Sequence, residues 1–352
     1  MSAVDGYKAG INFGDWMEMW PEDEEKLNTW LVEKDVAQVA SYGFDHIRLP
    51  FSYKIFMSDE KPGVFREEGL KHLDRMVSWC KKYGLNIILD LHIAPGYAFG
   101  NVDKGIPNPF LEDESYQEQF YDIWRMLARR YYSEGKNVAF ELLNEVVEEP
   151  ASRWNRIAGK AIQAIREIDK TRVIIYGGIY YNSVYYMKYL DVTDDPNIVY
   201  NFHFYESILF THQQAWPPAC AAYNKALQWP GELPGLGAFL DEHPEFAEKQ
   251  TRYIGRGLNK DTMLMDFEKV LEFRELFPNA PIYCGEFGVI KSADPESRRN
   301  WHKDIISIFN ELDIGRAAWD YKDGPYEHFA LVDIPNSKPF DEELMKILAS
   351  RK

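Results

Sequence analysis

The sequence predicts an α/β protein, a (β/α)8 TIM barrel with a helical segment inserted after the sixth strand. Eight short apolar or β-branched stretches alternate with amphipathic stretches along 352 residues. This alternation is typical of a ring of parallel strands covered by an outer ring of helices. A doubly wound sheet is the competing architecture, but no GxGxxG motif follows an early strand. We therefore expect a single barrel domain over residues 1–352.

The strands are expected where short apolar runs occur. Residues 87–89 and 173–175 are continuously apolar, as in strands that are buried on both faces. The eight expected strands are Ala9–Phe13, His46–Pro50, Asn86–His92, Val138–Leu143, Val173–Gly177, Ile198–His203, Ile282–Phe287 and Gly315–Asp320.

Helices are expected between these strands. Residues 66–83 carry an apolar face, and Gly84 supplies a stop signal after it. Residues 154–168 repeat apolar side chains at helical spacing, which predicts a second helix with one buried face.

The interval between the sixth and seventh strands is too long for an ordinary connection. The stretch from His203 to Ile282 is more than twice the ~30 residues that a helix and two short loops require. Residues 206–260 are rich in Pro and Gly and contain Trp216 and Trp229. We expect this segment to form an inserted helical subdomain over the barrel mouth, not a separate domain.

Composition narrows the class of partner. The formal net charge is −16, which argues against a nucleic-acid or anionic-membrane partner, since both require clustered Lys and Arg. The chain has 10 Trp, 22 Tyr and 21 Phe, and aromatic side chains beyond those a core needs suit neutral ring-shaped ligands such as sugars. The three cysteines have no CxxC or zinc-type spacing, so neither a disulfide framework nor a structural metal is indicated.

No targeting segment is evident. The N-terminus lacks the basic and apolar regions of a secretory signal, and no run approaches ~18 apolar residues. We therefore expect a cytoplasmic location unless a signal was removed.

The carboxyl ends of barrel strands carry the active site, which selects candidate residues without any alignment. The expected strands end in polar or aromatic side chains: Arg48, Asp90, His92, Glu141, Asn144, Glu145, His203, Tyr205, Glu286, Trp319 and Asp320. Two glutamates facing each other across a barrel mouth suit glycoside hydrolysis, and Glu145 and Glu286 are that pair. For a single Glu a surface role is the ordinary interpretation, but both of these follow strands.

Two other kinds of active site have weaker support in the sequence. His92 and His203 with neighbouring carboxylates could bind a divalent ion, but the sequence has no HxH or HExxH motif. Serine or cysteine nucleophile chemistry has no GxSxG motif to support it.

These residues resemble a known family. The segments IRLP around Arg48, NE at 144–145, HFY at 203–205 and GEFG around Glu286, together with His92 and Trp319, are similar to glycoside hydrolase family 5, also called cellulase family A, of clan A. Within it, GINFGDW, FELLNEVVE and YCGEFGVI are especially similar to the bacterial endoglucanase C type. Val146 stands where Pro usually follows the acid/base Glu, a change that this type shares.

The resemblance implies that Glu145 is the general acid/base and Glu286 the nucleophile, with retention of anomeric configuration. A nucleophile must be ionised, and we expect Arg48 and Tyr205 to lower the pKa of Glu286 by hydrogen bonding. We expect burial and the charge of Glu286 to raise the pKa of Glu145. Retention predicts carboxyl groups ~5–5.5 Å apart, and inversion ~6.5–9.5 Å.

Substrate-binding roles follow for neighbouring residues. Asn144 is expected to hydrogen-bond the sugar 2-hydroxyl, a contact that strengthens in the transition state. His92 and His203 are expected to bind hydroxyl or carboxylate groups, with a purely structural role at the barrel rim as the alternative for each.

The tryptophans are expected to divide between substrate platforms and packing. Trp319 is expected beneath the sugar at the cleaved position, with closure of the barrel core as its alternative. Trp216 would either stack on a remote sugar or have no ligand. Trp16 and Trp20 follow the first strand, where a substrate-contacting loop is expected, and Trp229 is expected to pack within the insert.

The implied activity is a retaining endo-β-1,4-glucanase on β-glucans, including mixed-linkage β-1,3-1,4-glucan, acting as a monomer without metal or cofactor. Three alternatives stay open: a mannan-, glucomannan- or xylan-active enzyme of the same family, a metallohydrolase, and a glycan-binding barrel without activity.

Overall fold

Eight parallel strands close into a barrel in the computed structural model, which describes residues 2–322, 324 and 329–351. Each strand pairs in parallel with the next around the ring, and pairing of the second strand with the third completes the circle. The strands are β1 (Gly10–Asn12), β2 (His46–Ser52), β3 (Asn86–Ala94), β5 (Val138–Glu141), β6 (Ile174–Gly177), β7 (Ile198–Phe204), β8 (Ile282–Phe287) and β9 (Gly315–Ala318). The predicted (β/α)8 fold is confirmed.

A two-residue strand, β4 (Tyr97–Ala98), extends β3 as an antiparallel hairpin. The other differences from prediction lie at strand ends. β5 ends at Glu141 and not Leu143, because beyond it the chain keeps only separate hydrogen bonds to its neighbours, from Leu142 N to Ile175 O and from Asn144 N to Leu91 O.

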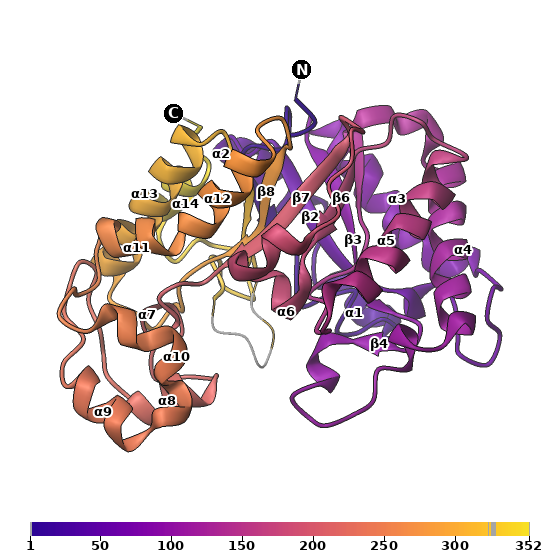
Figure 1. Cartoon of the computed structure of the whole chain (residues 1–352). Coiled ribbons are helices and arrows are strands. Elements are labelled where there is room, and N and C mark those ends of the chain that lie inside the picture. Colours follow the sequence, from indigo (N-terminus) through magenta and orange to yellow (C-terminus); the bar gives the residue numbers. More distant parts are fainter. Residues whose placement is uncertain (1, 323, 325–328, 352) are drawn as a thin grey trace.

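Helices surround the barrel (Figure 1). The α-helices outside the sixth-to-seventh strand interval are α1 (Glu24–Thr29), α2 (Glu33–Tyr42), α3 (Glu67–Lys82), α4 (Glu114–Arg130), α5 (Ala151–Arg166), α6 (Ile179–Asn182), α13 (Pro295–Glu311) and α14 (Glu342–Leu348). Short 3-10 segments in the same part of the chain are η1 (Tyr53–Ile55), η2 (Phe99–Asn101), η3 (Pro109–Leu111), η4 (Tyr132–Asn137) and η5 (Val184–Tyr189).

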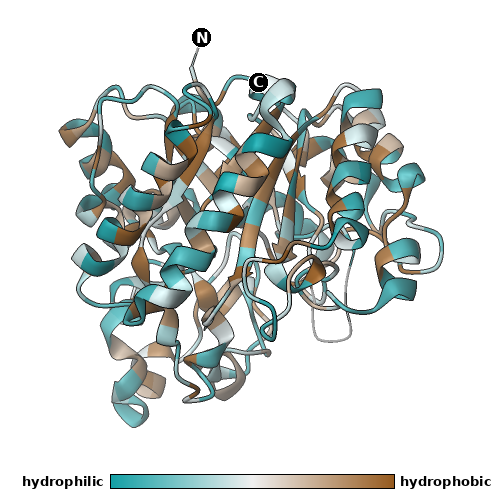
Figure 2. Ribbon diagram, turned by 90° about the vertical axis from the view of Figure 1, so that its right-hand side faces the viewer, coloured by the Kyte–Doolittle hydropathy of each residue, from teal (hydrophilic) through white to brown (hydrophobic). Residues whose placement is uncertain are grey.

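The predicted helix faces are buried. In α3 the side chains of Leu70, Leu73, Val77 and Cys80 are buried, and Gly84 adopts a left-handed φ of 72° just beyond the helix. Figure 2 shows the same division along the ribbons: brown apolar residues lie on strands and inward helix faces, and teal polar residues lie on outward faces.

The interval between β7 and β8 contains the elements α7 (Ile208–Thr211), α8 (Pro218–Tyr223), α9 (Leu236–Glu242), η6 (Pro244–Phe246), α10 (Ala247–Gln250), η7 (Thr251–Tyr253), α11 (Lys260–Asp266) and α12 (Glu268–Leu276). Helices α7 to α10 lie together at the lower left of Figure 1. Trp229 is buried there, donates from Nε1 to Asp304 Oδ2 (2.8 Å) and contacts Phe210, as predicted for a packing residue.

The end of the barrel near the chain termini is filled by apolar side chains. Inward residues such as Ile88 and Ala139 form a buried cluster there with Ala3, Val4 and Tyr7 of the N-terminal segment. This end is therefore plugged, with a buried hydrogen bond between His46 Nε2 and the Tyr283 hydroxyl (2.6 Å) among its side chains. Within the part of the chain that the structure describes, none of the helices has the length and apolar character that crossing a bilayer requires.

Candidate active site

The inward face of the barrel changes from apolar to charged towards the carboxyl ends of the strands. Ile88 and Ala139 lie in the apolar plug, and two residues further along the same strands are Asp90 and Glu141. Because strand side chains alternate between faces, Asp90 and Glu141 also point into the barrel. The strand periodicity itself therefore places carboxylates above the plug.

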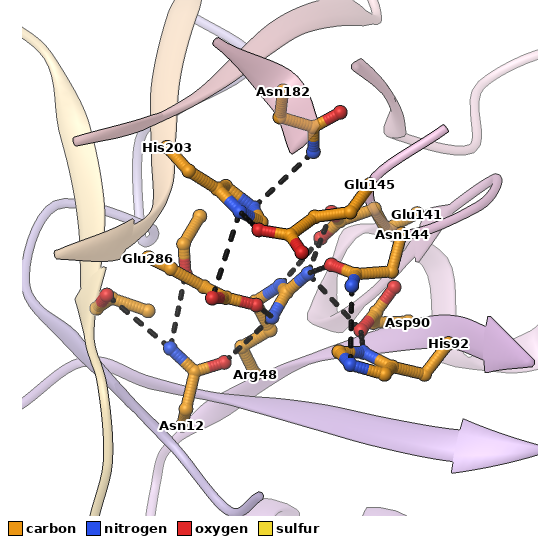
Figure 3. Close-up of polar contacts among 12 residues, drawn as sticks. Asn12, Arg48, Asp90, His92, Glu141, Asn144, Glu145, Asn182, His203 and Glu286 are labelled. Carbon is orange, nitrogen blue, oxygen red and sulfur yellow. Dashed lines mark hydrogen bonds and ion pairs between the residues drawn. The ribbon is translucent and has the colours of Figure 1, made fainter. Parts of the chain in front are cut away.

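Arg48 is the centre of this polar layer and is fully buried (Figure 3). Its Nε and Nη2 donate to the two carboxylate oxygens of Glu141 at 2.7 and 2.9 Å, and its Nη2 lies 3.0 Å from Asp90 Oδ2. Nη1 donates to Glu286 Oε1 at 3.0 Å and to Asn12 Oδ1 at 2.9 Å. Burial raises the pKa of Asp90 to about 7, and the charge of Arg48 opposes that shift.

Two asparagines hold the strand that carries Glu286. Asn201 Oδ1 accepts from Gly285 N at 2.8 Å, and Asn12 Nδ2 donates to Gly285 O at 3.0 Å. A Cβ on Gly285 would lie 2.8 Å from Asn201 Nδ2 and 3.0 Å from His203 Nε2, so a larger residue would have to displace these side chains. The bond network thus fixes the backbone immediately before Glu286.

Glu145 and Glu286 face each other beside His203. One oxygen of each carboxylate and a His203 ring nitrogen all lie within 4.8 Å of one another. His203 Nδ1 is 2.8 Å from Glu145 Oε1 and 3.6 Å from Glu286 Oε2. Tyr205 donates its hydroxyl to Glu286 Oε2 at 3.0 Å. The structure therefore places the predicted residues Glu145, His203 and Tyr205 around Glu286.

Burial raises the pKa of both glutamates, and their neighbours then act on the two pKa values in opposite directions. Burial and then the charge of Glu286 raise the pKa of Glu145 well above its ordinary value. Arg48 and Tyr205 each act to lower the pKa of Glu286, as predicted, but burial outweighs them and the pKa of Glu286 is raised. The net rise comes from desolvation of the buried Glu286 carboxylate, which is the largest effect.

His92 and Asn144 form one hydrogen-bonded chain from Arg48. Arg48 can only donate, so Asn144 Oδ1 accepts from it at 2.8 Å and Asn144 Nδ2 faces His92 Nε2 at 3.1 Å. His92 Nδ1 lies 2.7 Å from Asp90 Oδ2. Burial lowers the pKa of His92 to about 3. His92 thus contacts a carboxylate, that of Asp90.

The aromatic residues fall into three groups. Trp319 is partly buried, and its ring stacks on His92 with centroids 6.1 Å apart at an interplanar angle of 15°. The side chain of Trp216 is 63% exposed. Trp16 is fully buried and donates from Nε1 to Lys26 O, and Trp20 packs against Trp30. The expected substrate contact from Trp16 is therefore wrong, because its ring belongs to the core.

Glu145, His203 and Glu286 are the one group of potential metal ligands within the described residues. The alternative metal site that joins His92 to His203 is not favoured by the geometry. Both ring nitrogens of His92 already lie in hydrogen bonds to Asp90 and Asn144, and an ion would have to displace one of them.

Sequence reasoning did not assign roles to Asn12, Asp90, Glu141, Asn182 or Asn201. A signal existed for the buried ones in strands, since a polar side chain within an otherwise apolar strand requires a partner. No local signal marked Asn182, which follows β6 and lies 3.2 Å from His203 Nε2 through its Nδ2.

Comparisons with known proteins identify the family of the chain. The family model for cellulase (glycosyl hydrolase family 5) matches residues 17–325. The chain is 44% identical over 348 residues to endoglucanase C of Acetivibrio thermocellus, which covers 98% of this chain and 99% of that protein. It is 34% identical to cellodextrinase A of Ruminococcus flavefaciens, over 88% of this chain and 84% of that one.

Solved structures share the fold. Endoglucanase Cel5A of Thermotoga maritima superposes with a TM-score of 0.74 at 21% identity, covering 99% of this chain and 100% of that chain. The strand-end carboxylates, the family match over most of the chain and the full-length relative lead to one conclusion. The chain belongs to glycosyl hydrolase family 5, the cellulase family, and is a glycoside hydrolase.

Proposed function

We propose that the protein is a retaining endo-β-1,4-glucanase that hydrolyses β-glucans, including mixed-linkage β-1,3-1,4-glucan, with Glu145 as acid/base and Glu286 as nucleophile. The observation that carries the proposal is the approach of the two carboxylates to within 4.8 Å, measured between one oxygen of each. This separation favours direct attack by one carboxylate, because inversion requires room for a water molecule between them. The name of the full-length relative, endoglucanase C, supports the substrate class.

In the first step, a Glu286 oxygen attacks the anomeric carbon while Glu145 protonates the glycosidic oxygen, whose bond to that carbon breaks. In the second, Glu145 removes a proton from water, which attacks the same carbon and releases Glu286. The assignment of roles rests on the contacts. Burial raises the pKa of both glutamates, but Arg48 and Tyr205 donate to Glu286 and favour its ionised form, whereas at Glu145 the charge of Glu286 adds to burial in favouring the protonated form.

The neighbouring residues would bind the sugar. Asn144 would donate to the 2-hydroxyl, with its amide already oriented by Arg48 and His92. Trp319 would form the platform at the cleaved position, and exposed Trp216 would stack on a sugar further along the chain. We further propose that residues 206–260 act as a subdomain bordering the barrel mouth and that the enzyme works as a monomer.

Time-resolved product analysis tests the substrate and mode. β-Glucan, glucomannan and xylan should be digested in parallel, with chain length and product spread followed from the first minutes. Rapid shortening of β-glucan to mixed oligosaccharides supports the proposal. Faster attack on glucomannan or xylan, or release of a single short product, contradicts it.

The metal-independent mechanism has its own test. Dialysis against a strong chelator should leave the rate on β-glucan unchanged, because the proposed steps use only Glu145 and Glu286. Loss of activity that returns on adding a divalent ion would instead support the metallohydrolase alternative.

A further inference from the structure

Asn182 lies behind His203, on the side away from the two catalytic carboxylates (Figure 3). Its Nδ2 is 3.2 Å from His203 Nε2, and the residue is 1% exposed. His203 in turn presents Nδ1 to Glu145 Oε1 at 2.8 Å. An unbroken chain of contacts therefore runs from Asn182 through the imidazole to Glu145.

The backbone around Asn182 has an uncommon conformation that places its amide beside His203. Tyr180, Tyr181 and Asn182, three of the four residues of α6, have φ values of 53°, 60° and 52°, so this element is a left-handed turn without a glycine and not a regular α-helix. This conformation is unfavourable for residues with a Cβ, and above all for tyrosine. Ser183 then pairs in parallel with His203, which locks the segment against β7.

Gly177, the last residue of β6, makes room for the amide. A Cβ at this position would lie 2.5 Å from Asn182 Oδ1 and 2.8 Å from Asn182 Nδ2, closer than any side chain can approach. The loop conformation and the missing side chain both serve to place Asn182 against His203.

His203 is a neutral imidazole with a single ring proton, so the position of that proton matters. Burial and the positive charge of Arg48 hold its pKa well below the ordinary value. In the orientation that the structure gives the Asn182 amide, its NH2 group faces Nε2 and can only donate, so Nε2 accepts and the ring proton resides on Nδ1. Nδ1 faces oxygens of both glutamates, where a donor is required.

We propose that Asn182 is a positioning residue that sets the His203 tautomer and thereby places the catalytic proton of Glu145 on Oε2. With Nδ1–H donated to Oε1, that oxygen is an acceptor, and the carboxylic proton must sit on the other oxygen. In Figure 3 the second oxygen of Glu145 points toward the middle of the cluster. The opposite tautomer would draw the proton onto Oε1, hydrogen-bonded to His203 Nδ1 and unable to reach the glycosidic oxygen.

This inference rests on the proposed role of Glu145 and deepens it. The same arrangement serves the second step, in which ionised Glu145 keeps Oε1 bonded to Nδ1–H and uses Oε2 to take a proton from water. Asn182 itself touches no reacting atom and acts only through His203.

Nitrogen NMR of the histidine-labelled wild-type enzyme tests the tautomer directly. The His203 signals are identified by their absence from His203→Gln. We expect a protonated Nδ1 and an unprotonated Nε2. A protonated Nε2 would overturn the proposal, and this readout does not depend on whether any Asn182 variant folds.

Kinetics with aryl β-cellobiosides test the consequence. In Asn182→Leu, which is similar in size but lacks the donor, kcat/KM for a dinitrophenol leaving group should stay within about threefold of wild type. For phenol it should fall by about 10- to 100-fold, because only a poor leaving group needs the proton. KM for cellooligosaccharides should change by less than about twofold. An equal loss on both aryl substrates, or no loss, would overturn the proposal.

Asn155→Leu is the matched control. Asn155 is a buried amide on α5 that donates to Tyr189 O and accepts from Tyr176, away from both glutamates. Its loss should affect all leaving groups equally. Glu145→Ala separates the two levels of the account: if it shows no leaving-group dependence, the proposed role of Glu145 fails. If Glu145→Ala shows leaving-group dependence and Asn182→Leu shows none, only the inference about Asn182 fails.

Discussion

Arg48 and Glu141 form a two-pronged ion pair inside the barrel, with Nε–Oε2 and Nη2–Oε1 distances of 2.7 and 2.9 Å. Both side chains are fully shielded from solvent. The pair supports the layer on which the site is built, since Arg48 reaches Glu286 and Asn144 from the same guanidinium.

Removing Glu141 should therefore destabilise the protein. In Glu141→Ala, two Arg48 donors and Asn201 Nδ2 lose their acceptor in a buried site. Breaking a buried pair in this way costs about 3–5 kcal/mol. Urea unfolding measures the change. Asp313→Asn, which removes the exposed ion pair with Lys8, is the control and should cost less than about 1 kcal/mol. Equal losses in the two variants would contradict a structural role for the buried pair.

The raised pKa of Glu145 predicts how stability changes with pH. Its folded-state pKa lies above the unfolded value, so its contribution to stability is fully present below the unfolded pKa and is lost as pH rises through the folded pKa. Glutamine does not ionise, so Glu145→Gln should melt at a higher temperature than wild type in alkaline buffer, by a margin that shrinks towards pH 4. Calorimetry from pH 4 to 9 measures this, with exposed Glu60→Gln as control. A margin that grows on acidification would contradict the assignment.

Glu286→Gln should abolish turnover of β-glucan and leave binding of cellooligosaccharides intact, as measured by calorimetric titration. The same variant should lower the pKa of Glu145, because the Glu286 charge raises it in the wild type. Carbon NMR of labelled glutamate follows that titration. Full activity in this variant, or an unchanged Glu145 pKa, would be incompatible with the proposed pair.

Loss of Trp319 and loss of Trp216 should affect activity differently, depending on the length of the substrate. Trp319→Ala should lower kcat/KM at least about tenfold on every glucan, because Trp319 stacks on His92 within the site. Trp216→Ala should weaken only long substrates and leave the melting temperature unchanged, since its side chain is 63% exposed. A loss on cellobiosides in Trp216→Ala would contradict a remote position.

The sequence predicted the barrel because strand and helix periodicities are local properties. It also predicted the pairing of Glu145 with Glu286, since the carboxyl ends of barrel strands converge on one edge. The sign of the Glu286 pKa shift was not predictable, because desolvation depends on everything that surrounds the carboxylate. Trp16 was misassigned for the same reason: its burial is a property of the whole fold.

Asn182 shows a further limit. Its role depends on three left-handed residues and on Gly177, which together place the amide against His203. The spacing of these residues in the sequence does not predict that conformation. The contact between Asn182 and His203 depends on the pairing of β6 with β7, which brings the two residues together.

Trapping the covalent intermediate tests the central claim most directly. A 2-deoxy-2-fluoro cellobioside with an activated leaving group should inactivate the enzyme, and mass spectrometry should locate the label on the peptide that contains Glu286. Label on Glu286, protected by cellooligosaccharide, is the predicted result. Label on another residue, or inverted product with no trapped sugar, would contradict the account.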